Sequence, residues 1–271
     1  MPELPEVQTV VNQIRPDLLN QTVKSITPIW GKVFHNFTEK EARLKIYGKQ
    51  IIDVSRRAKF IIINFKEGIV AIHLRMTGKL YFLNKNDVPS KYATAYLTFN
   101  NGEKLIFDDV RKFGRIYLHK NMKSINKRHG PEPLEDSFNS EILINIMKSR
   151  KRNVKALLLD QKILAGIGNI YADESLWKSQ IHPNSLSHQI PKIRLKKLYE
   201  SIKIILTDAI NQNGTTIINF SVNGESGKYT NELKIYGKEN SKCFRCNFKI
   251  KKIRVAGRGT YLCTKCQKRY K

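Results

Sequence analysis

The chain begins Met1-Pro2-Glu3-Leu4-Pro5-Glu6, and apolar residues at helical spacing follow, which predicts a helix over about 6–19. Prolines ahead of such a run are typical of a helix N-terminus. The same residues permit a chemical interpretation. After removal of Met1, Pro2 would carry a free secondary amine beside the Glu3 carboxylate, and such an amine can form an iminium directly at an electrophilic carbon. It is less basic than lysine, because an α-amino group titrates about two to three units lower.

The residues after this helix read mostly as short strands up to about Tyr117. Residues 59–65 (KFIIINF) predict a buried strand, and residues 69–74 predict the next one after a turn at Glu67-Gly68. Two further strand patterns, 92–99 and 104–107, flank Asn100-Asn101-Gly102, which is typical of a hairpin. Short strands joined by turns predict a β-sandwich.

The pattern changes at His129-Gly130-Pro131-Glu132-Pro133, which is typical of a linker. Apolar residues then recur at helical spacing around 142–147 and 198–209. Residues 223–228 (NGESGK) predict a mobile loop. The predicted fold is α+β and multidomain, with an N-terminal β-sandwich and flanking helices over 1–130, a helical domain over 131–222, and a loop with a cysteine module over 223–271.

The composition is strongly basic. The 271 residues include 49 Lys and Arg against 23 Asp and Glu, which gives a formal net charge of +26. An AT-rich genome would account for part of the lysine excess but not for so few acids. This balance favours a polyanionic partner, with nucleic acid as the first candidate. No apolar run approaches the ~20 residues of a membrane span, and no secretory signal pattern opens the sequence.

The 4 cysteines form two pairs near the C-terminus, Cys243-x2-Cys246 and Cys263-x2-Cys266. Two such pairs supply four thiolates to one tetrahedral ion, and a site closed by four protein ligands is structural. We therefore expect one structural Zn²⁺ and a cytoplasmic protein, because clustered cysteines favour a metal site in a reducing compartment. The basic residues between the pairs predict a zinc-stapled β-hairpin that presents cations to phosphates.

These features together resemble the formamidopyrimidine-DNA glycosylase family, over essentially the whole chain. Shorter matches follow in the same order: Arg56-Arg57-Ala58-Lys59, His73-Leu74-Arg75-Met76-Thr77-Gly78, Asp109-Val110-Arg111-Lys112-Phe113-Gly114, Leu158-Leu159-Asp160-Gln161, Gly166-Ile167-Gly168-Asn169-Ile170-Tyr171-Ala172 and Tyr236-Gly237. Leu4 favours this family over its sister, endonuclease VIII, which usually has Gly before Pro5.

Members of this family excise oxidised purines from duplex DNA and cut the strand there. The resemblance implies that Pro2 attacks the anomeric carbon of the damaged nucleotide and that Glu3 acts as acid and base beside it. It implies that Lys59 serves the elimination steps, and that Arg258 binds phosphate and takes part in the later elimination. Without the resemblance, Lys59 would read as a surface lysine at the start of a strand.

A base must leave the stack before an enzyme can reach its sugar, and filling the gap offsets an unstacking cost of about a few kcal/mol. The resemblance implies that Met76, Arg111 and Phe113 form the wedge that fills this gap, with Arg111 also contacting DNA. Met76 alone would read as a core residue.

The stretch Gly166-Ile167-Gly168-Asn169 precedes a predicted helix over 170–177. The resemblance implies a helix–two-turns–helix element here, in which the helix N-terminus and Asn169 bind phosphate. It also implies that Arg150 and Lys155 contact the DNA backbone.

Some positions depart from the family pattern. Tyr92 stands in a run where histidines are frequent, so its hydroxyl would replace part of that phosphate contact. Lys112 stands where arginine is usual, which loses a bidentate donor. Ile218 and Lys228 depart in the loop that closes over the flipped base, so base preference is the property that the resemblance fixes least.

We therefore expect a monomeric bifunctional DNA glycosylase and AP lyase of base excision repair. Its partner would be double-stranded DNA with oxidised bases (8-oxoguanine, formamidopyrimidines) or abasic sites, cut by β,δ-elimination through a proline iminium. One alternative is an endonuclease VIII-like enzyme for oxidised pyrimidines, which the flipped-base loop would decide. The other is a non-catalytic zinc-containing nucleic-acid-binding protein, which gives no reason for Pro2-Glu3 or Lys59.

Overall fold

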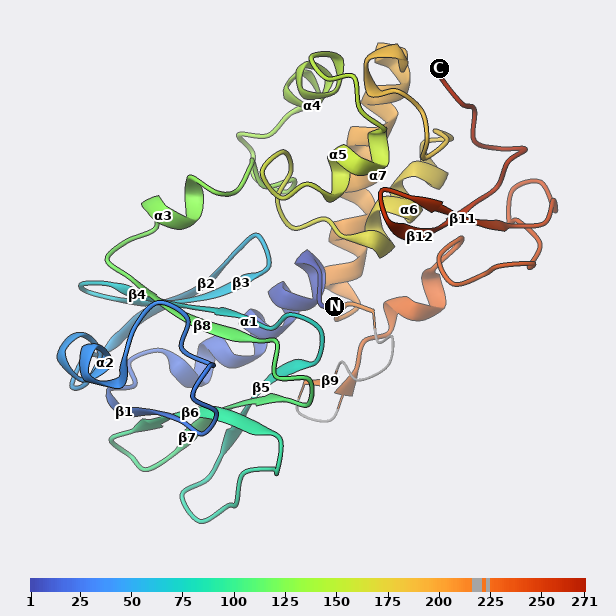
Figure 1. Ribbon diagram of the computed structural model, residues 1–271. Helices are drawn as coiled ribbons and strands as arrows, with labels where there is room; N and C mark the ends of the chain where they lie inside the picture. Colours follow the sequence, from blue (N-terminus) through green and yellow to red (C-terminus); the bar gives the residue numbers. More distant parts are fainter. Residues whose placement is uncertain (216–220, 223–224) are drawn as a thin grey trace. The chain divides into compact units, whose positions relative to one another are not determined.

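The computed structural model describes residues 1–215, 221–222 and 225–271, and Figure 1 shows their elements. They belong to two compact units: residues 1–127 with 213–228, and residues 128–212 with 229–271. The three expected segments are thus grouped into two units. The helical segment and the cysteine module cluster together, whereas the segment after residue 212 belongs with the β unit.

The first unit is a β-sandwich of two antiparallel four-stranded sheets. One has the order β1-β6-β7-β5 (Val23–Pro28, Ala93–Phe99, Lys104–Asp109, Gly78–Leu83), and the other has the order β2-β3-β4-β8 (Ile51–Arg57, Phe60–Phe65, Ile69–His73, Arg115–His119). Helix α1 (Leu4–Leu18) and both sheets share one apolar core, to which Val10, Ile63 and Phe107 contribute. The predicted β-sandwich is confirmed.

Strand β3 is covered on both faces. Ile61 and Ile63 belong to the main core, whereas Ile62 packs in a second cluster with Ala71 and Ile125. Ile125 lies on the short helix α3 (Lys123–Asn126), and α2 (Glu39–Lys45) and the two-residue strands β9 (Ser221–Val222) and β10 (Glu225–Ser226) complete this unit. A strand buried on both faces loses the alternation of a half-exposed strand, which explains the pattern of residues 59–65.

The second unit combines helices with a β-hairpin. Its elements are α4 (Ser140–Lys148), α5 (Val154–Leu159), α6 (Asn169–Lys178), the 3₁₀ turn η1 (Ser187–Gln189), α7 (Lys192–Asn211), the 3₁₀ turn η2 (Tyr229–Glu232), β11 (Lys251–Val255) and β12 (Arg258–Leu262). Helix α6 contacts α5, α7 and β12. It is consequently buried nearly all round, including the polar side chains of Asp173 and Glu174.

Gly78 closes the turn between β4 and β5 by donating its N–H to Leu74 O at 3.0 Å. A Cβ at Gly78 would lie 2.9 Å from both Leu74 Cα and Phe107 Cε2. We expect Gly78→Ala to destabilise the protein by about 1–3 kcal/mol, because the turn or the buried ring must move. Gly31→Ala is the control, since nothing lies within 4 Å of a Cβ there, and it should stay within about 0.5 kcal/mol. Urea unfolding compares the two, and equal midpoints would contradict this steric argument.

Candidate active site and nucleic-acid interface

Pro2 and Glu3 lie directly ahead of α1, and a neighbouring carboxylate fixes their backbone. Glu3 N donates to Glu6 Oε2 at 2.8 Å, and Val7 N donates to Glu3 O at 3.1 Å as the helix begins. The second oxygen of Glu6 accepts from Thr215 N at 2.8 Å and from Thr215 Oγ1 at 3.1 Å. Buried Glu6 therefore joins the N-terminal residues to Thr215 within the first unit.

Lys59 lies in the two-residue turn between β2 and β3. The preceding Ala58 has φ +54°, in the left-handed region that costs a non-glycine residue roughly 1–2 kcal/mol. Arg56 holds this turn, since its Nη1 donates to Ala58 O at 2.9 Å and its Nε donates to Gln8 Oε1 at 3.1 Å. The guanidinium thus ties the Lys59 turn to α1. Lys59 is only 4% exposed, so it is not a solvated surface lysine.

The three proposed wedge residues come together at the surface of the first unit. Met76 and Phe113 are each 45% exposed. Arg111 links them, with its Cζ 4.6 Å from the Phe113 ring centroid and its Nη1 3.1 Å from Met76 Sδ. Phe113 is therefore not a core residue. An exposed aromatic ring, thioether and guanidinium in one cluster can stack against nucleobases.

Asp109, which sequence reasoning did not single out, organises the loops that carry this wedge. Its side chain is 1% exposed. Its Oδ2 accepts from Gly114 N at 2.6 Å, and its Oδ1 accepts from Arg111 N at 3.1 Å and from the Thr77 hydroxyl. One carboxylate thereby fixes the loop after β4 and the loop after β7. Two adjacent acids, Asp108 and Asp109, at the end of an apolar strand in so basic a chain were the signal available in the sequence.

Tyr92 lies beside the same loops. Asp109 N donates to Tyr92 O at 3.0 Å, and Tyr92 N donates to Ser90 Oγ at 3.1 Å. Its ring is exposed, with Lys91 Nζ 5.2 Å from the centroid. A hydroxyl and an ammonium at this position suit the phosphate contact that is expected of Tyr92.

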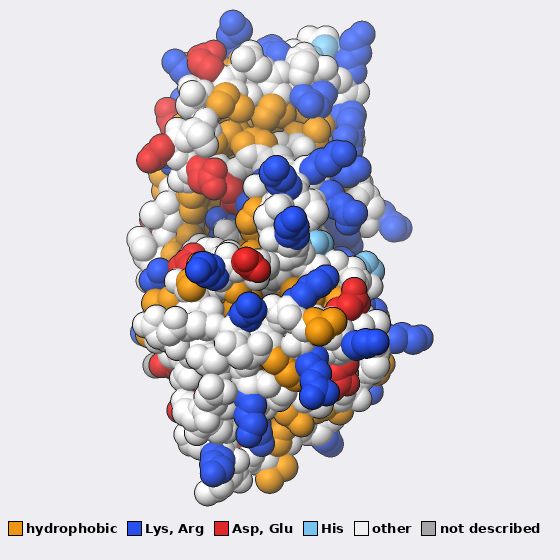
Figure 2. Space-filling model, turned by 90° about the vertical axis from the view of Figure 1, so that its left-hand side faces the viewer, with side chains coloured by type: hydrophobic (Ala, Val, Ile, Leu, Met, Phe, Trp, Pro, Cys, Tyr) orange, Lys and Arg blue, Asp and Glu red, His pale blue; other side chains and the backbone are white. Residues whose placement is uncertain are grey.

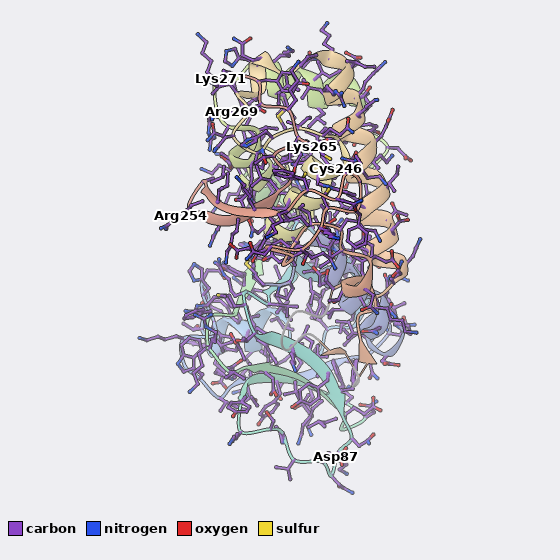
Figure 3. The ribbon with its side chains drawn as sticks, turned by 90° about the vertical axis from the view of Figure 1, so that its right-hand side faces the viewer. Asp87, Cys246, Arg254, Lys265, Arg269 and Lys271 are labelled. Atoms are coloured by element: carbon purple, nitrogen blue, oxygen red, sulfur yellow. The ribbon has the colours of Figure 1, made fainter. Side chains whose placement is uncertain are left out.

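The second unit brings Asn169 and Arg258 next to each other. Asn169 begins α6, and its Nδ2 donates to Gly259 O at 2.9 Å. Arg258 follows a two-residue hairpin turn, Ala256-Gly257, in which φ is +50° and +73°. Two positive φ values produce the tight turn that matches strand twist, so Arg258 stands exposed at the hairpin tip. Arg254 on the paired strand extends outward in Figure 3.

Lys155 does not lie at the surface, where a lysine that contacts the DNA backbone is expected. Its ammonium is fully buried, 2.6 Å from Asp173 Oδ1, and it donates to Thr260 Oγ1 at 2.7 Å. Thr260 Oγ1 in turn donates to Arg258 O at 3.0 Å. The burial follows from the position of Lys155 on α5, which packs against α6. Lys155 therefore supports the backbone that carries Arg258 instead of presenting its charge to solvent.

Arg150 lies at the C-terminal end of α4. Its Nη1 donates to Ile146 O at 2.9 Å and to Ser149 Oγ at 2.8 Å. The first bond uses a carbonyl in the last turn of the helix, where a cation is favourable. A guanidinium has five N–H donors, so donors remain for a phosphate.

The four cysteines converge as expected. Their sulfur atoms all lie within 4.8 Å of one another, with 3.9 Å between Cys243 and Cys266 and 3.5 Å between Cys246 and Cys263. Tetrahedral Zn–S bonds of about 2.3 Å separate the sulfurs by about 3.8 Å, so the set fits one zinc ion. Burial opposes ionisation of Cys243, but hydrogen bonds from the backbone of Arg245 and the indole of Trp177 lower its pKa to about 6. Such a thiol is a ready zinc ligand.

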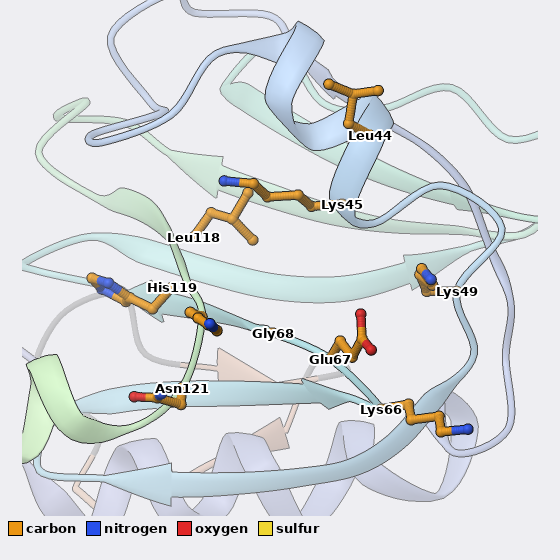
Figure 4. A pocket seen from close by; sticks show the side chains of 10 residues that line it. Leu44, Lys45, Lys49, Lys66, Glu67, Gly68, Leu118, His119 and Asn121 are labelled. Atoms are coloured by element: carbon orange, nitrogen blue, oxygen red, sulfur yellow. The ribbon is translucent and has the colours of Figure 1, made fainter.

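A hollow of about 520 Å³ lies elsewhere in the first unit, lined by Lys45, Lys49, Lys66, Lys120 and others. Figure 4 shows it beside Gly68 and His119. Ile69 pairs with His119 at this end of the sheet, whereas Phe60, next to Lys59, pairs with His73 at the other end. The hollow thus lies at the opposite end of this sheet from Lys59. Lys and Arg are also numerous over the face in Figure 2.

Ile218 lies outside the described residues. Lys228 is described, and it forms an isolated antiparallel bridge with Thr215. Among the described residues, none of the helices has the length and apolar character that a bilayer crossing requires.

The effect of Lys155 on the stability of the protein should depend on pH, because its partner Asp173 can take up a proton. Burial raises the pKa of Asp173 from 3.8 to about 7, although Lys155 opposes the shift. The folded state therefore holds this proton more tightly than the unfolded state, and this group costs stability as the pH rises from about 4 to about 7. Lys155→Met should lose about 3–5 kcal/mol at pH 8, where the buried carboxylate lacks its cation. The loss should be smaller at pH 5, where Asp173 takes up a proton.

Urea unfolding at both pH values measures this loss. The double variant Lys155→Met/Asp173→Leu is the matched control, because it removes both charges, and it should recover much of the stability at pH 8. An equal loss at the two pH values, or no recovery in the double variant, would show that the pair is not electrostatically coupled.

Three protein-family models match successive parts of the chain. Residues 1–116 match the formamidopyrimidine-DNA glycosylase N-terminal domain, residues 129–221 match the H2TH domain of the same enzyme, and residues 240–269 match the zinc finger found in FPG and IleRS. A formamidopyrimidine-DNA glycosylase of Lactobacillus helveticus is 39% identical over 100% of both chains. One of Pelotomaculum thermopropionicum is 38% identical over 99% of both.

Solved structures of formamidopyrimidine-DNA glycosylases are also similar to this chain over nearly its whole length. A Lactococcus lactis Fpg mutant in complex with DNA containing Fapy-dG is 34% identical, with a TM-score of 0.92 over 99% of this chain and 100% of that one. The Lactococcus lactis Fpg bound to DNA containing an abasic site has a TM-score of 0.91 at 34% identity, over 98% and 100%. Since the sequence relatives match along their full length and the cysteines meet as the zinc finger requires, the chain belongs to the formamidopyrimidine-DNA glycosylase family.

Proposed function

We propose that this protein excises oxidised purines, 8-oxoguanine and formamidopyrimidines, from duplex DNA and then cleaves the strand as an AP lyase. The observation that carries the proposal is the fixed N-terminus. Glu6 holds the backbone beside Pro2, and Arg56 ties the buried Lys59 turn to the same helix. A non-catalytic binder would have no use for a buried lysine that follows the left-handed Ala58 in a turn tied to the helix after Pro2.

In the proposed reaction, Met1 is removed and the Pro2 nitrogen bonds to C1′ of the damaged nucleotide. The bond between C1′ and the base breaks, and the base leaves with the bonding electrons and with the proton that the Pro2 nitrogen gives up. Glu3 gives a proton to the ring oxygen as the sugar opens to the iminium, and Lys59 assists the transfers that follow. Loss of the C2′ proton then breaks the bond to the 3′ phosphate, and a second elimination breaks the bond to the 5′ phosphate.

The remaining residues bind DNA under this proposal. Arg150, Asn169 and Arg258 bind phosphates, and Tyr92 adds a contact from the first unit. Met76, Arg111 and Phe113 enter the stack when the damaged base leaves it. Relatives of known structure were solved with DNA containing Fapy-dG or an abasic site, which supports these substrates. We place the enzyme in the cytoplasm, as a monomer.

Borohydride trapping tests the proposal. The processed protein is incubated with duplex DNA containing 8-oxoguanine, and borohydride should reduce the iminium to a stable adduct on Pro2. A variant with Gly inserted before Pro2 has an amide nitrogen there and should give no adduct. Lys59→Met should trap but cut slowly, whereas Lys66→Met is the control lysine and should behave as wild type. An adduct on any lysine, or none at all, would sink the mechanism. Faster release of oxidised pyrimidines would favour the endonuclease VIII-like alternative.

Phe113→Ala tests the wedge. We expect it to slow excision of paired 8-oxoguanine by roughly 5- to 150-fold, because base–aromatic stacking is worth about 1–3 kcal/mol. Cutting at a preformed abasic site should slow less, since no base remains to be displaced. Phe248→Ala is the matched control, because Phe248 is equally exposed, at 45%. A large drop in melting temperature with equal losses on both substrates would mean that Phe113 acts through stability.

A further inference from the structure

One face of α6 carries three residues at i, i+4 and i+8 that each contact the C-terminal module by a polar side-chain atom. These contacts are Asn169 Nδ2 to Gly259 O at 2.9 Å, Tyr261 N to Asp173 Oδ2 at 2.9 Å and Trp177 Nε1 to Cys243 Sγ at 3.4 Å. Residues four apart lie above one another on a helix, so the three contacts form a row. The row begins at the proposed phosphate site and ends at a zinc ligand.

Trp177 is held firmly at its end of the row. Arg245, within the first CxxC pair, places its Cζ 4.3 Å from the Trp177 ring centroid and donates to Trp177 O at 3.1 Å. The ring also packs against the buried cluster that Ile235, Cys243, Ile250 and Cys263 form. Contacts with the face of the ring and with the backbone carbonyl of Trp177 therefore hold this residue in place. They fix the direction of the indole N–H.

An indole nitrogen is a donor only, so this N–H needs an acceptor. Fully buried Cys243 supplies one, and a thiolate accepts more strongly than a neutral thiol. Four thiolates around one Zn²⁺ leave a net negative charge on the ligand set. A donor directed at one sulfur offsets part of that charge and orients the ligand, as hydrogen-bond partners of metal ligands generally do.

We propose that Trp177 is a positioning residue of the zinc site, whose hydrogen bond to Cys243 slows loss of the metal and joins it to the face of α6 that carries Asn169. Its effect is on retention of the ion and not on the reaction at Pro2. The proposal thus stands apart from the glycosylase chemistry.

The test uses the zinc-loaded full-length protein and the substitution Trp177→Phe, which keeps an aromatic ring and removes the N–H. Zinc transfer to a chromogenic chelator should become roughly 10- to 100-fold faster, the range seen when partners of metal ligands are lost. Trp30→Phe is the matched control. Trp30 also has an arginine over its ring, with Arg115 Cζ at 4.7 Å, but it lies in the other unit, and its variant should release zinc as wild type does.

A second readout separates the hydrogen bond from packing. In the cobalt-substituted protein, the thiolate-to-metal charge-transfer band should move to lower energy in Trp177→Phe, because the sulfur lone pair loses its donor. A wild-type release rate would overturn the proposal. Faster release with an unmoved band would also overturn it, since the indole would then act only by filling space.

Discussion

Buried carboxylates that accept hydrogen bonds from backbone N–H groups hold the N-terminus, several loops and strand β12 of this protein. Glu6 accepts hydrogen bonds from Glu3 N and Thr215 N. Asp109 accepts them from Arg111 N and Gly114 N. In the second unit Asp173 receives Tyr261 N, and Glu174 receives the N–H groups of residues 234–236. Hydrogen bonds to a charged group contribute about 1.5–3 kcal/mol each. Such bonds can fix exposed loops that have few apolar contacts of their own.

This use of acids suits a protein that must attract a polyanion. With 23 acidic residues against 49 basic ones, every carboxylate placed inside removes negative charge from the surface that meets phosphates. Placing it there has a cost, because burial raises the pKa of both Asp173 and Glu174, and only the donors around them oppose the shift. Tyr261 and residues 234–236 are therefore held by groups that are themselves expensive to bury. A neutral acceptor would hold the same N–H groups more weakly.

The sequence predicted the elements whose burial leaves a periodic or continuous apolar signal. Strands β3, β4, β6 and β7 and helices α1, α4, α6 and α7 are of this kind. Strand β2 was not predicted, because Asp53, Ser55 and Arg56 interrupt its apolar residues and are held by tertiary contacts instead. At the candidate site, spacing alone predicted the cysteine cluster, since its geometry is local. The burial of Lys155 could not be predicted from the sequence. Its partner Asp173 lies on another helix, and a lysine without a known partner is expected at the surface.

Packing of the cysteine module against α6 explains why the helical segment and this module form one unit. The module has a small apolar cluster of its own, and Trp177 of α6 packs against it. A hairpin of two five-residue strands is marginal alone, so it needs both the metal and the helix. The row Asn169, Asp173 and Trp177 supplies an amide, a carboxylate and an indole at one-turn intervals, and each meets a different part of the module. Helix α6 thus acts as the scaffold along which the zinc ligands, the hairpin and the proposed phosphate site are placed in register.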